Sequence, residues 1–269
     1  MNILILGDVS GPAGVKAIKE KLPKIIQKKK IDFVILNGEN AANTGRGITK
    51  EIFEEFLKAG ADVITTGNHV WDNKEAEEIA AKNINFLRPL NMLKDSPGKG
   101  EGIYNKNGKR FIVLNLMGNV FMKKCDDVFI EAKKFLERFK LGDGKSDFII
   151  VDMHGETTSE KMAMGHLFDG KATMVVGTHT HVPTSDYRIM EKGTAYQTDI
   201  GMCGDYNSVI GMNRENSLKK FLKDPSAENH VPALGEATIS GLLVTADDET
   251  GLAKKVQPII LGGSLHERI

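Results

Sequence analysis

The sequence predicts an α/β fold, with mixed sheets flanked by helices, in a single domain that spans residues 1–269. Short apolar runs alternate with amphipathic, charged segments along the first two thirds of the chain. Runs of this kind are typical of strands that are buried on both faces. The last third contains pairs of strand-like segments around turn residues, which indicate antiparallel hairpins. Together these patterns favour two packed sheets with helices outside them.

Six apolar runs are expected to form buried strands, at residues 3–6, 33–36, 63–65, 111–114, 148–151 and 174–176. Helical spacing of apolar residues occurs between them, at residues 15–28, 50–58, 74–81 and 128–139. Thr49 suits the N-cap of the second helix, because its hydroxyl can accept a hydrogen bond from an amide of the first turn. The two predicted hairpins join residues 186–190 to 194–198 and residues 239–246 to 252–260.

The composition is that of an ordinary globular protein, with 41% hydrophobic and 27% charged residues. Basic and acidic residues are equal in number, 36 each, so extended nucleic-acid binding through a broad basic field is not expected. No segment approaches the length of a membrane span, and the apolar start of the chain is too short for a signal peptide. Cys125 and Cys203 have no CxxC partner, which favours reduced thiols and a cytoplasmic location.

Polar residues able to bind metal ions follow five of the predicted strands. They form the motifs Gly7-Asp8, Asn37-Gly38-Glu39-Asn40, Gly67-Asn68-His69, Asp152-Met153-His154-Gly155-Glu156 and Gly177-Thr178-His179-Thr180-His181. Because the carboxyl ends of parallel strands converge on one crevice, residues far apart in the sequence are expected to meet there. Glycines beside several of the candidate ligands permit the tight turns that such a crevice requires.

Taken singly, most of these residues have an ordinary structural interpretation. Asp8 suits a turn or helix cap, Asn40 and Asn68 suit turns, and His154 suits a hydrogen-bonded structural histidine. The pair His179 and His181 is harder to dismiss, because alternate residues of an extended segment share a face and would place two imidazoles side by side. The other histidines, His166, His230 and His266, have no comparable setting and are expected to be structural.

The combination of the motifs favours a metal site. Asp8 and Glu39 would repel each other in a shared crevice, and desolvating an unpaired carboxylate costs several kcal/mol. The five motifs contain no lysine or arginine to neutralise them. Oxygen and imidazole ligands without cysteine suit manganese, iron, zinc or nickel. The candidate ligands are too many for one ion with an open position, and fit two ions roughly 3.5–4 Å apart that share a bridging carboxylate.

The motifs resemble those of the calcineurin-like metallophosphoesterase superfamily and, more narrowly, of the YmdB-like phosphodiesterases of bacteria. The resembling segments are Gly7-Asp8-Val9, residues 37–42, residues 45–49, residues 66–72, residues 152–156, residues 177–182, residues 198–202 and residues 208–212. The chain departs from the wider superfamily at Ser10, where a histidine is usual, and at Glu39-Asn40 in the second motif. The YmdB-like group shares both departures, which puts general protein phosphatase activity in doubt.

The resemblance implies a metallophosphoesterase-type α/β/β/α sandwich with two iron or manganese ions in its site. Carried over by motif, one ion takes Asp8, Asn40 and His181, and the other takes Asn68, His154 and His179. Glu39 bridges the two ions, and His69 is not a ligand. The implied activity is hydrolysis of cyclic nucleotides, notably 2′,3′-cyclic ones. In this mechanism a metal-bound hydroxide attacks a small phosphodiester substrate, and His69 protonates the leaving alkoxide.

Three alternatives stay open at this point. A dinucleotide-binding oxidoreductase is disfavoured, because the glycines after Leu6 lack the G-x-G-x-x-G spacing and the histidines would have no role. A non-catalytic regulatory or nucleotide-binding protein with structural metals is disfavoured by His69. A nuclease is disfavoured for long polymers by the missing basic field. Arg46 is a candidate phosphate contact or an ordinary loop residue, and a homo-oligomer is compatible with the sequence.

Overall fold

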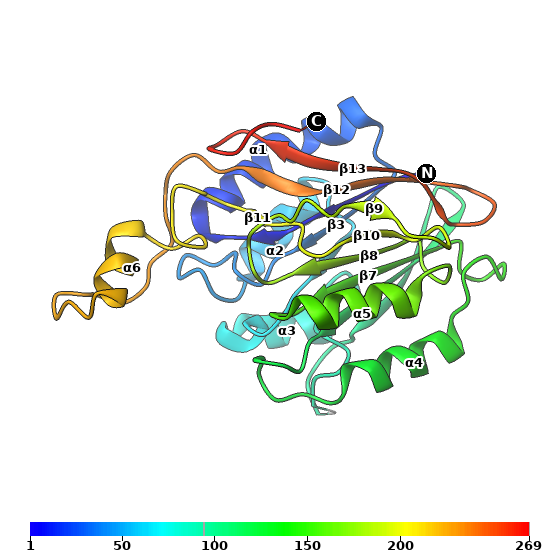
Figure 1. Cartoon of the computed structure of the whole chain (residues 1–269), viewed down its shortest axis with the longest axis horizontal. Helices are drawn as coiled ribbons and strands as arrows, with labels where there is room; N and C mark the ends of the chain where they lie inside the picture. The colour runs from blue at the N-terminus through cyan, green and yellow to red at the C-terminus, as the bar shows by residue number, and fades with distance from the viewer. Residues whose placement is uncertain (94, 269) are drawn as a thin grey trace.

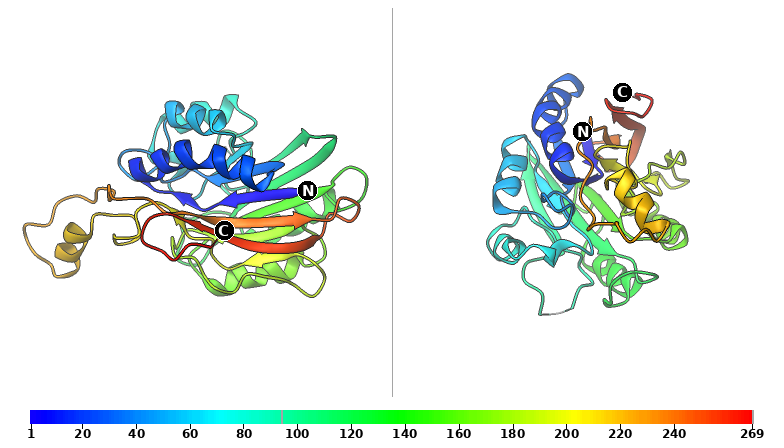
Figure 2. Two further views of the ribbon diagram at one scale, coloured as in Figure 1. Left: turned by 90° about the horizontal axis from the view of Figure 1, so that it is seen from above. Right: turned by 90° about the vertical axis from the view of Figure 1, so that its left-hand side faces the viewer.

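The computed structural model describes residues 1–93 and 95–268, and these form four layers in the order helices, sheet, sheet, helices (Figures 1 and 2). The expected α/β/β/α sandwich with two mixed sheets is therefore confirmed. No helix in the described part of the chain has the length and apolar character needed to cross a membrane.

The first sheet has the strand order β13-β12-β1-β3-β4. Its strands are β1 (Asn2–Leu6), β3 (Phe33–Asn37), β4 (Val63–Thr65), β12 (Ile239–Ala246) and β13 (Ala253–Leu261). Strands β1, β3 and β4 are parallel to one another, whereas β12 and β13 form the predicted C-terminal hairpin and pair antiparallel with β1.

The second sheet has the strand order β5-β6-β7-β8-β10-β9. Its strands are β5 (Glu101–Lys106), β6 (Lys109–Met117), β7 (Phe148–His154), β8 (Met174–Thr178), β9 (Arg188–Ile189) and β10 (Ala195–Gln197). Strands β6, β7, β8 and β10 are parallel, and antiparallel edge strands lie on both sides. A short parallel pair, β2 (Asp8–Val9) with β11 (Met202–Cys203), lies beside the two sheets.

Three apolar layers hold the sandwich together. The first sheet packs against α1 (Gly11–Lys29), α2 (Lys50–Lys58) and α3 (Glu75–Lys82), and the second packs against α4 (Val128–Arg138) and α5 (Thr158–Phe168). Along β1, Leu4 faces the helices while Ile3 and Ile5 face the opposite sheet. Burial on both faces explains the continuous apolar runs, since neither side of the strand meets water.

Several elements differ from the sequence-based expectation. Helix α2 begins as predicted, with the Thr49 hydroxyl accepting a hydrogen bond from the Ile52 amide at 3.3 Å. Helix α5 was not predicted, because Glu160 and Lys161 are buried and interrupt its apolar stripe. Helix α6 (Arg214–Phe221) lies in an arm, residues 204–238, that projects away from the sandwich (Figures 1 and 2).

Candidate metal centre

The predicted site residues meet where the carboxyl ends of β1, β3, β4, β7 and β8 converge, as expected for parallel strands. The backbone at Gly67 shows how tightly they are packed. A side-chain Cβ at this glycine would lie 2.2 Å from Nε2 of His154 and 2.5 Å from Oε2 of Glu39. Only a residue without a Cβ lets the loop after β4 approach these two side chains.

Three potential metal-ligand atoms surround Nε2 of the fully buried His154. Oδ1 of Asn68 and Oε1 of Glu39 both lie at 3.0 Å, and Nδ1 of His179 lies at 3.1 Å. One imidazole nitrogen carries a single proton or a single lone pair, so it cannot satisfy three partners. In addition, ligand atoms of Glu39, His154 and His179 all lie within 4.8 Å of one another. Such convergence fits side chains that share a cation.

A second group lies beside the first. Nε2 of His181 lies 3.3 Å from Oδ1 of Asn40, and both side chains are buried. Oδ2 of Asp8 accepts a hydrogen bond from the His179 amide at 3.1 Å, whereas Oδ1 of Asp8 is buried without a hydrogen-bond partner in the described part of the chain. A buried carboxylate oxygen without a partner is costly, and a metal ion would satisfy it. The residues present therefore fit a bound metal.

Neighbouring side chains orient the imidazoles. The Thr178 hydroxyl donates to the buried Asp152 at 2.7 Å, so it accepts from Nδ1 of His154, which lies 2.9 Å away. Nδ1 of His181 donates to the carbonyl of Ile210 at 2.8 Å. In each ring, this second hydrogen bond leaves Nε2 directed at the centre, as in known histidine–metal sites. Asp152 belongs to a predicted motif, and its position indicates a supporting role.

The segment from His179 to His181 does not have the extended backbone that was expected. His179 has φ of 98° and His181 has φ of 66°, so the chain bends at both residues. His179 contacts His154, while His181 contacts Asn40. The bend is held at Thr180, whose amide and hydroxyl both donate to Oδ2 of Asp199, at 3.1 and 2.7 Å.

The carboxylate of Asp199 is itself buried and pairs with the buried Nζ of Lys161 at 2.7 Å. Sequence reasoning assigned neither residue a role. Lys161 lies on a helix that the apolar pattern did not indicate. Asp199 has no histidine beside it and does not directly follow a glycine, unlike several of the predicted ligands. Asp199 contacts Thr180 directly and Lys161 holds Asp199, so the ion pair supports the bend between the histidines.

Burial and close charged neighbours shift the pKa values of the side chains at the centre. Burial raises the pKa of Asp8 to about 6. Burial also acts to raise the pKa of Glu39, but the adjacent His154 outweighs it and lowers this pKa to about 2. Burial acts to lower the pKa of His154, yet the Glu39 carboxylate raises it to about 9. The pKa of His179 falls to about 3 because of burial and the neighbouring His154. A neutral His179 is ready to act as a ligand.

His69 stands beside this cluster and contacts it differently. Its amide donates to Oε2 of Glu39 at 2.9 Å, while Nδ1 of its ring lies 2.7 Å from Oδ2 of Asp72. Asp72 ends the short 3-10 helix η1 (Val70–Asp72), which starts directly after His69. The ring of His69 lines a cleft of about 420 Å³ together with Glu39 and His179.

The cleft has residues that the sequence did not place there. His230, expected to be structural, lines it together with Arg46. The arm brings His230 to the cleft, and nothing in its neighbouring residues signals this position.

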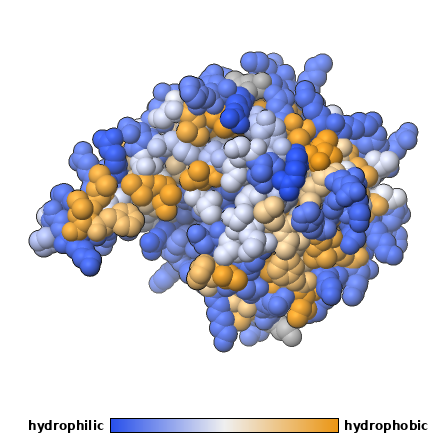
Figure 3. Space-filling view, viewed as in Figure 1, coloured by the Kyte–Doolittle hydropathy of each residue, from blue (hydrophilic) through white to orange (hydrophobic). Residues whose placement is uncertain are grey.

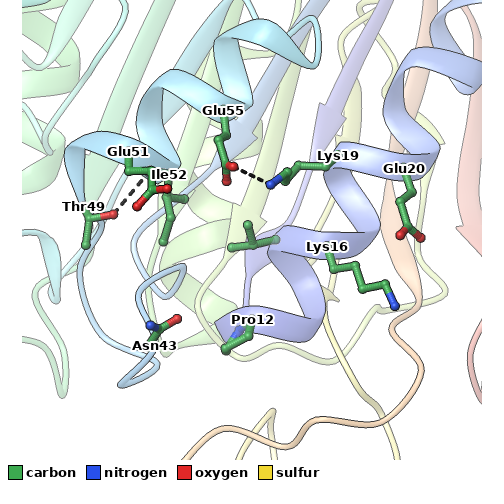
Figure 4. Close-up of a pocket in the computed structure, with 10 residues that line it drawn as sticks. Pro12, Lys16, Lys19, Glu20, Asn43, Thr49, Glu51, Ile52 and Glu55 are labelled. Atoms are coloured by element: carbon green, nitrogen blue, oxygen red, sulfur yellow. Dashed lines mark hydrogen bonds and ion pairs between the residues drawn. The ribbon is translucent and has the colours of Figure 1, made fainter.

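A separate hollow of about 470 Å³ lies between α1 and α2, bordered by the ion pair of Lys19 and Glu55, and its lining contains no histidine (Figure 4).

Residues 4–259 match the model of a family described as YmdB-like protein. The chain belongs to the YmdB-like family. It is 43% identical over 261 residues to the 2′,3′-cyclic-nucleotide 2′-phosphodiesterase of Bacillus subtilis (strain 168), a match that covers 97% of each protein. The predicted family resemblance is thus confirmed.

Solved structures share the fold of this YmdB-like chain. It is similar to a phosphatase from Mycoplasma pneumoniae, with a TM-score of 0.89 and 35% identity, over 97% of this chain and 93% of the other. It also shares its fold with Haemophilus influenzae NAD nucleotidase, with a TM-score of 0.57 and 16% identity, over 97% of this chain and 56% of the other.

Proposed function

We propose that this chain is a metal-dependent phosphodiesterase that hydrolyses 2′,3′-cyclic nucleotides. The observation that carries the proposal is the convergence of Asn68, Glu39 and His179 on Nε2 of His154, at a cleft that His69 also lines. The activity by which the Bacillus subtilis relative is named supports the substrate class. Cleavage of a phosphodiester releases an alkoxide that needs a proton, and His69 is a candidate proton donor beside the ligand cluster.

The proposed site holds two transition-metal ions, with iron or manganese favoured by its oxygen and imidazole donors. Asn68, His154 and His179 would hold one ion. Asp8, Asn40 and His181 would hold the other, and Glu39 would bridge them. When bound, such ions supply Lewis acidity, which activates water and neutralises charge on the phosphate oxygens.

The chain's own residues have three tasks in this proposal. As a water oxygen bonds to phosphorus and the bond from phosphorus to the ribose oxygen breaks, His69 donates a proton to that ribose oxygen, which opens the ring and leaves a phosphomonoester. Asp72 orients the His69 ring. Arg46 lines the cleft, which supports a contact of its guanidinium with the phosphate. By analogy with the Bacillus subtilis relative, the proposed bond is the one to the 2′ oxygen, and the product is the nucleoside 3′-monophosphate.

Turnover of 2′,3′-cyclic AMP by the purified chain tests the proposal. We expect conversion to adenosine 3′-monophosphate, loss of turnover after chelation, and recovery with Mn²⁺ or Fe²⁺. The Glu39→Ala variant serves as the control for a contaminating enzyme. If metal-replete protein retains its ions but converts no phosphodiester, the chain is a metal-containing regulatory protein and the proposal is wrong.

A further inference from the structure

We propose that Phe221, on the arm that carries α6, recognises the nucleobase of the substrate by stacking on it. This inference rests on the proposed function and extends it from the phosphate to the rest of the substrate. Phe221 lines the same cleft as His69 and His179, although it lies on the separate, projecting arm.

The cleft has two chemically different walls. One wall carries the polar and titratable groups of the candidate metal centre. The other comes from the arm and is mainly apolar, where Val209, Ile210, Met212 and Phe221 lie with the polar Ser217 and His230. A ligand that fills the cleft must therefore combine a charged group with an apolar part. A cyclic nucleotide has this character, since its phosphate is anionic and its base is flat and weakly polar on both faces.

Phe221 is the one phenyl ring among the described residues that line the cleft, and 78% of it is exposed. It belongs to none of the three buried clusters of the sandwich. An exposed aromatic ring beside a binding site gains favourable contact when a base covers its face. Stacking of this kind tolerates every base, because each base has a π-face. The chemistry therefore fits a site that accepts cyclic nucleotides of different bases.

A second observation on α6 points to a ligand. Ser217 lies one helical turn before Phe221, at the i−4 position, so both residues lie on one face of the helix. The Ser217 side chain is 1% exposed, lines the cleft, and has no hydrogen-bond partner for Oγ in the described part of the chain. A buried hydroxyl without a partner is unfavourable, so a polar group of the ligand would stabilise it.

The arm also exposes apolar side chains that do not line the cleft. Leu222 is 79% exposed, and hydrophobic residues are visible along the projecting arm in Figure 3. Leu222 directly follows Phe221 but lies outside the cleft lining. It is therefore a matched control, since it has similar exposure, the same helix end and no predicted contact with substrate.

The test compares two cyclic phosphodiesters that differ in the presence of a base. 2′,3′-Cyclic AMP carries adenine, whereas glycerol 1,2-cyclic phosphate has the same five-membered phosphate ring and no base. We expect Phe221→Ala to lower kcat/KM for the cyclic nucleotide by about 5- to 100-fold, the range of base stacking on an aromatic ring. The base-free diester should change by less than about twofold, Phe221→Trp should retain activity on both, and Leu222→Ala should leave both unchanged.

An equal loss on both substrates, or no loss on the cyclic nucleotide, would overturn the role of Phe221. Sedimentation of each variant measures its oligomeric state. If Phe221→Ala changes that state and lowers kcat/KM equally on both diesters, Phe221 is a contact between copies of the chain. If the wild type hydrolyses neither diester, the proposed function fails separately. Binding measurements then test the role of Phe221. Phe221→Ala should weaken the binding of adenosine 3′-monophosphate but not that of glycerol phosphate. Equal affinity of wild type and variant for adenosine 3′-monophosphate would overturn the role.

Discussion

Oδ2 of Asp72 lies 2.7 Å from Nδ1 of His69, and Nζ of Lys123 lies 3.1 Å from the other oxygen of the same carboxylate. Burial acts to raise the pKa of Asp72, but the hydrogen bonds from His69 and Lys123 outweigh it and lower this pKa. An ionised Asp72 fixes the imidazole through Nδ1 and leaves Nε2 free for a second contact. This is the arrangement that a proton donor needs beside a leaving group.

If His69 is a general acid and not a ligand, His69→Ala should keep its metal ions but lose turnover. The loss should be on the order of 10²–10⁴-fold on a 2′,3′-cyclic nucleotide, whose ribose alkoxide needs a proton as it leaves. It should be much smaller on bis-p-nitrophenyl phosphate, because nitrophenolate is stable as an anion. Kinetics on both substrates, with the metal content of the variant, check this. Equal losses on the two substrates would remove His69 from the catalytic residues.

Asp72→Asn should act through His69 alone. We expect a loss of about 10- to 100-fold in kcat on the cyclic nucleotide, by analogy with the loss on removing a residue that orients a metal-ligating histidine. Metal content should stay at the wild-type value. Lys123→Ala is the matched control, since it leaves the pair of His69 and Asp72 intact, and it should change kcat by less than about threefold. A similar loss in both variants would indicate a general disturbance of the loop.

Glu39 and Asn40 are neighbours, but we expect their removal to have different effects on metal content. Glu39 contacts His154 and the His69 amide, whereas Asn40 contacts His181. A bridging carboxylate serves both ions, so Glu39→Ala should lose more metal than Asn40→Ala. Elemental analysis of the two purified variants measures this. Equal metal loss would contradict the bridging assignment.

Much of the fold was predictable because its strands are buried on both faces. Residues such as Ile5 and Ile150 lie between apolar neighbours in their strands, and the apolar runs therefore marked the strands directly. Helix α5 was missed because Lys161 is buried in an ion pair with Asp199, which no apolar pattern signals. The short strands β2 and β11 have two residues each, too few to show a period.

The candidate site was predictable to the extent that each ligand follows a strand. Strand ends of parallel sheets converge by topology, so His154 and Glu39 could be expected to meet. The positive φ angles of His179 and His181 were not predictable, because they depend on contacts between Thr180 and Asp199, which lie 19 residues apart. The position of His230 and Phe221 was not predictable either, since it depends on where the arm leaves the sandwich.

Metal content per chain, in protein purified without chelator, is the most direct measurement of the two-metal account. The seven candidate ligands Asp8, Glu39, Asn40, Asn68, His154, His179 and His181 exceed one coordination sphere with an open position. Elemental analysis should therefore find close to two transition-metal ions per chain, with iron or manganese as the main element. Protein that contains no such metal, and that gains no phosphodiesterase activity when manganese or iron is added, would contradict the account.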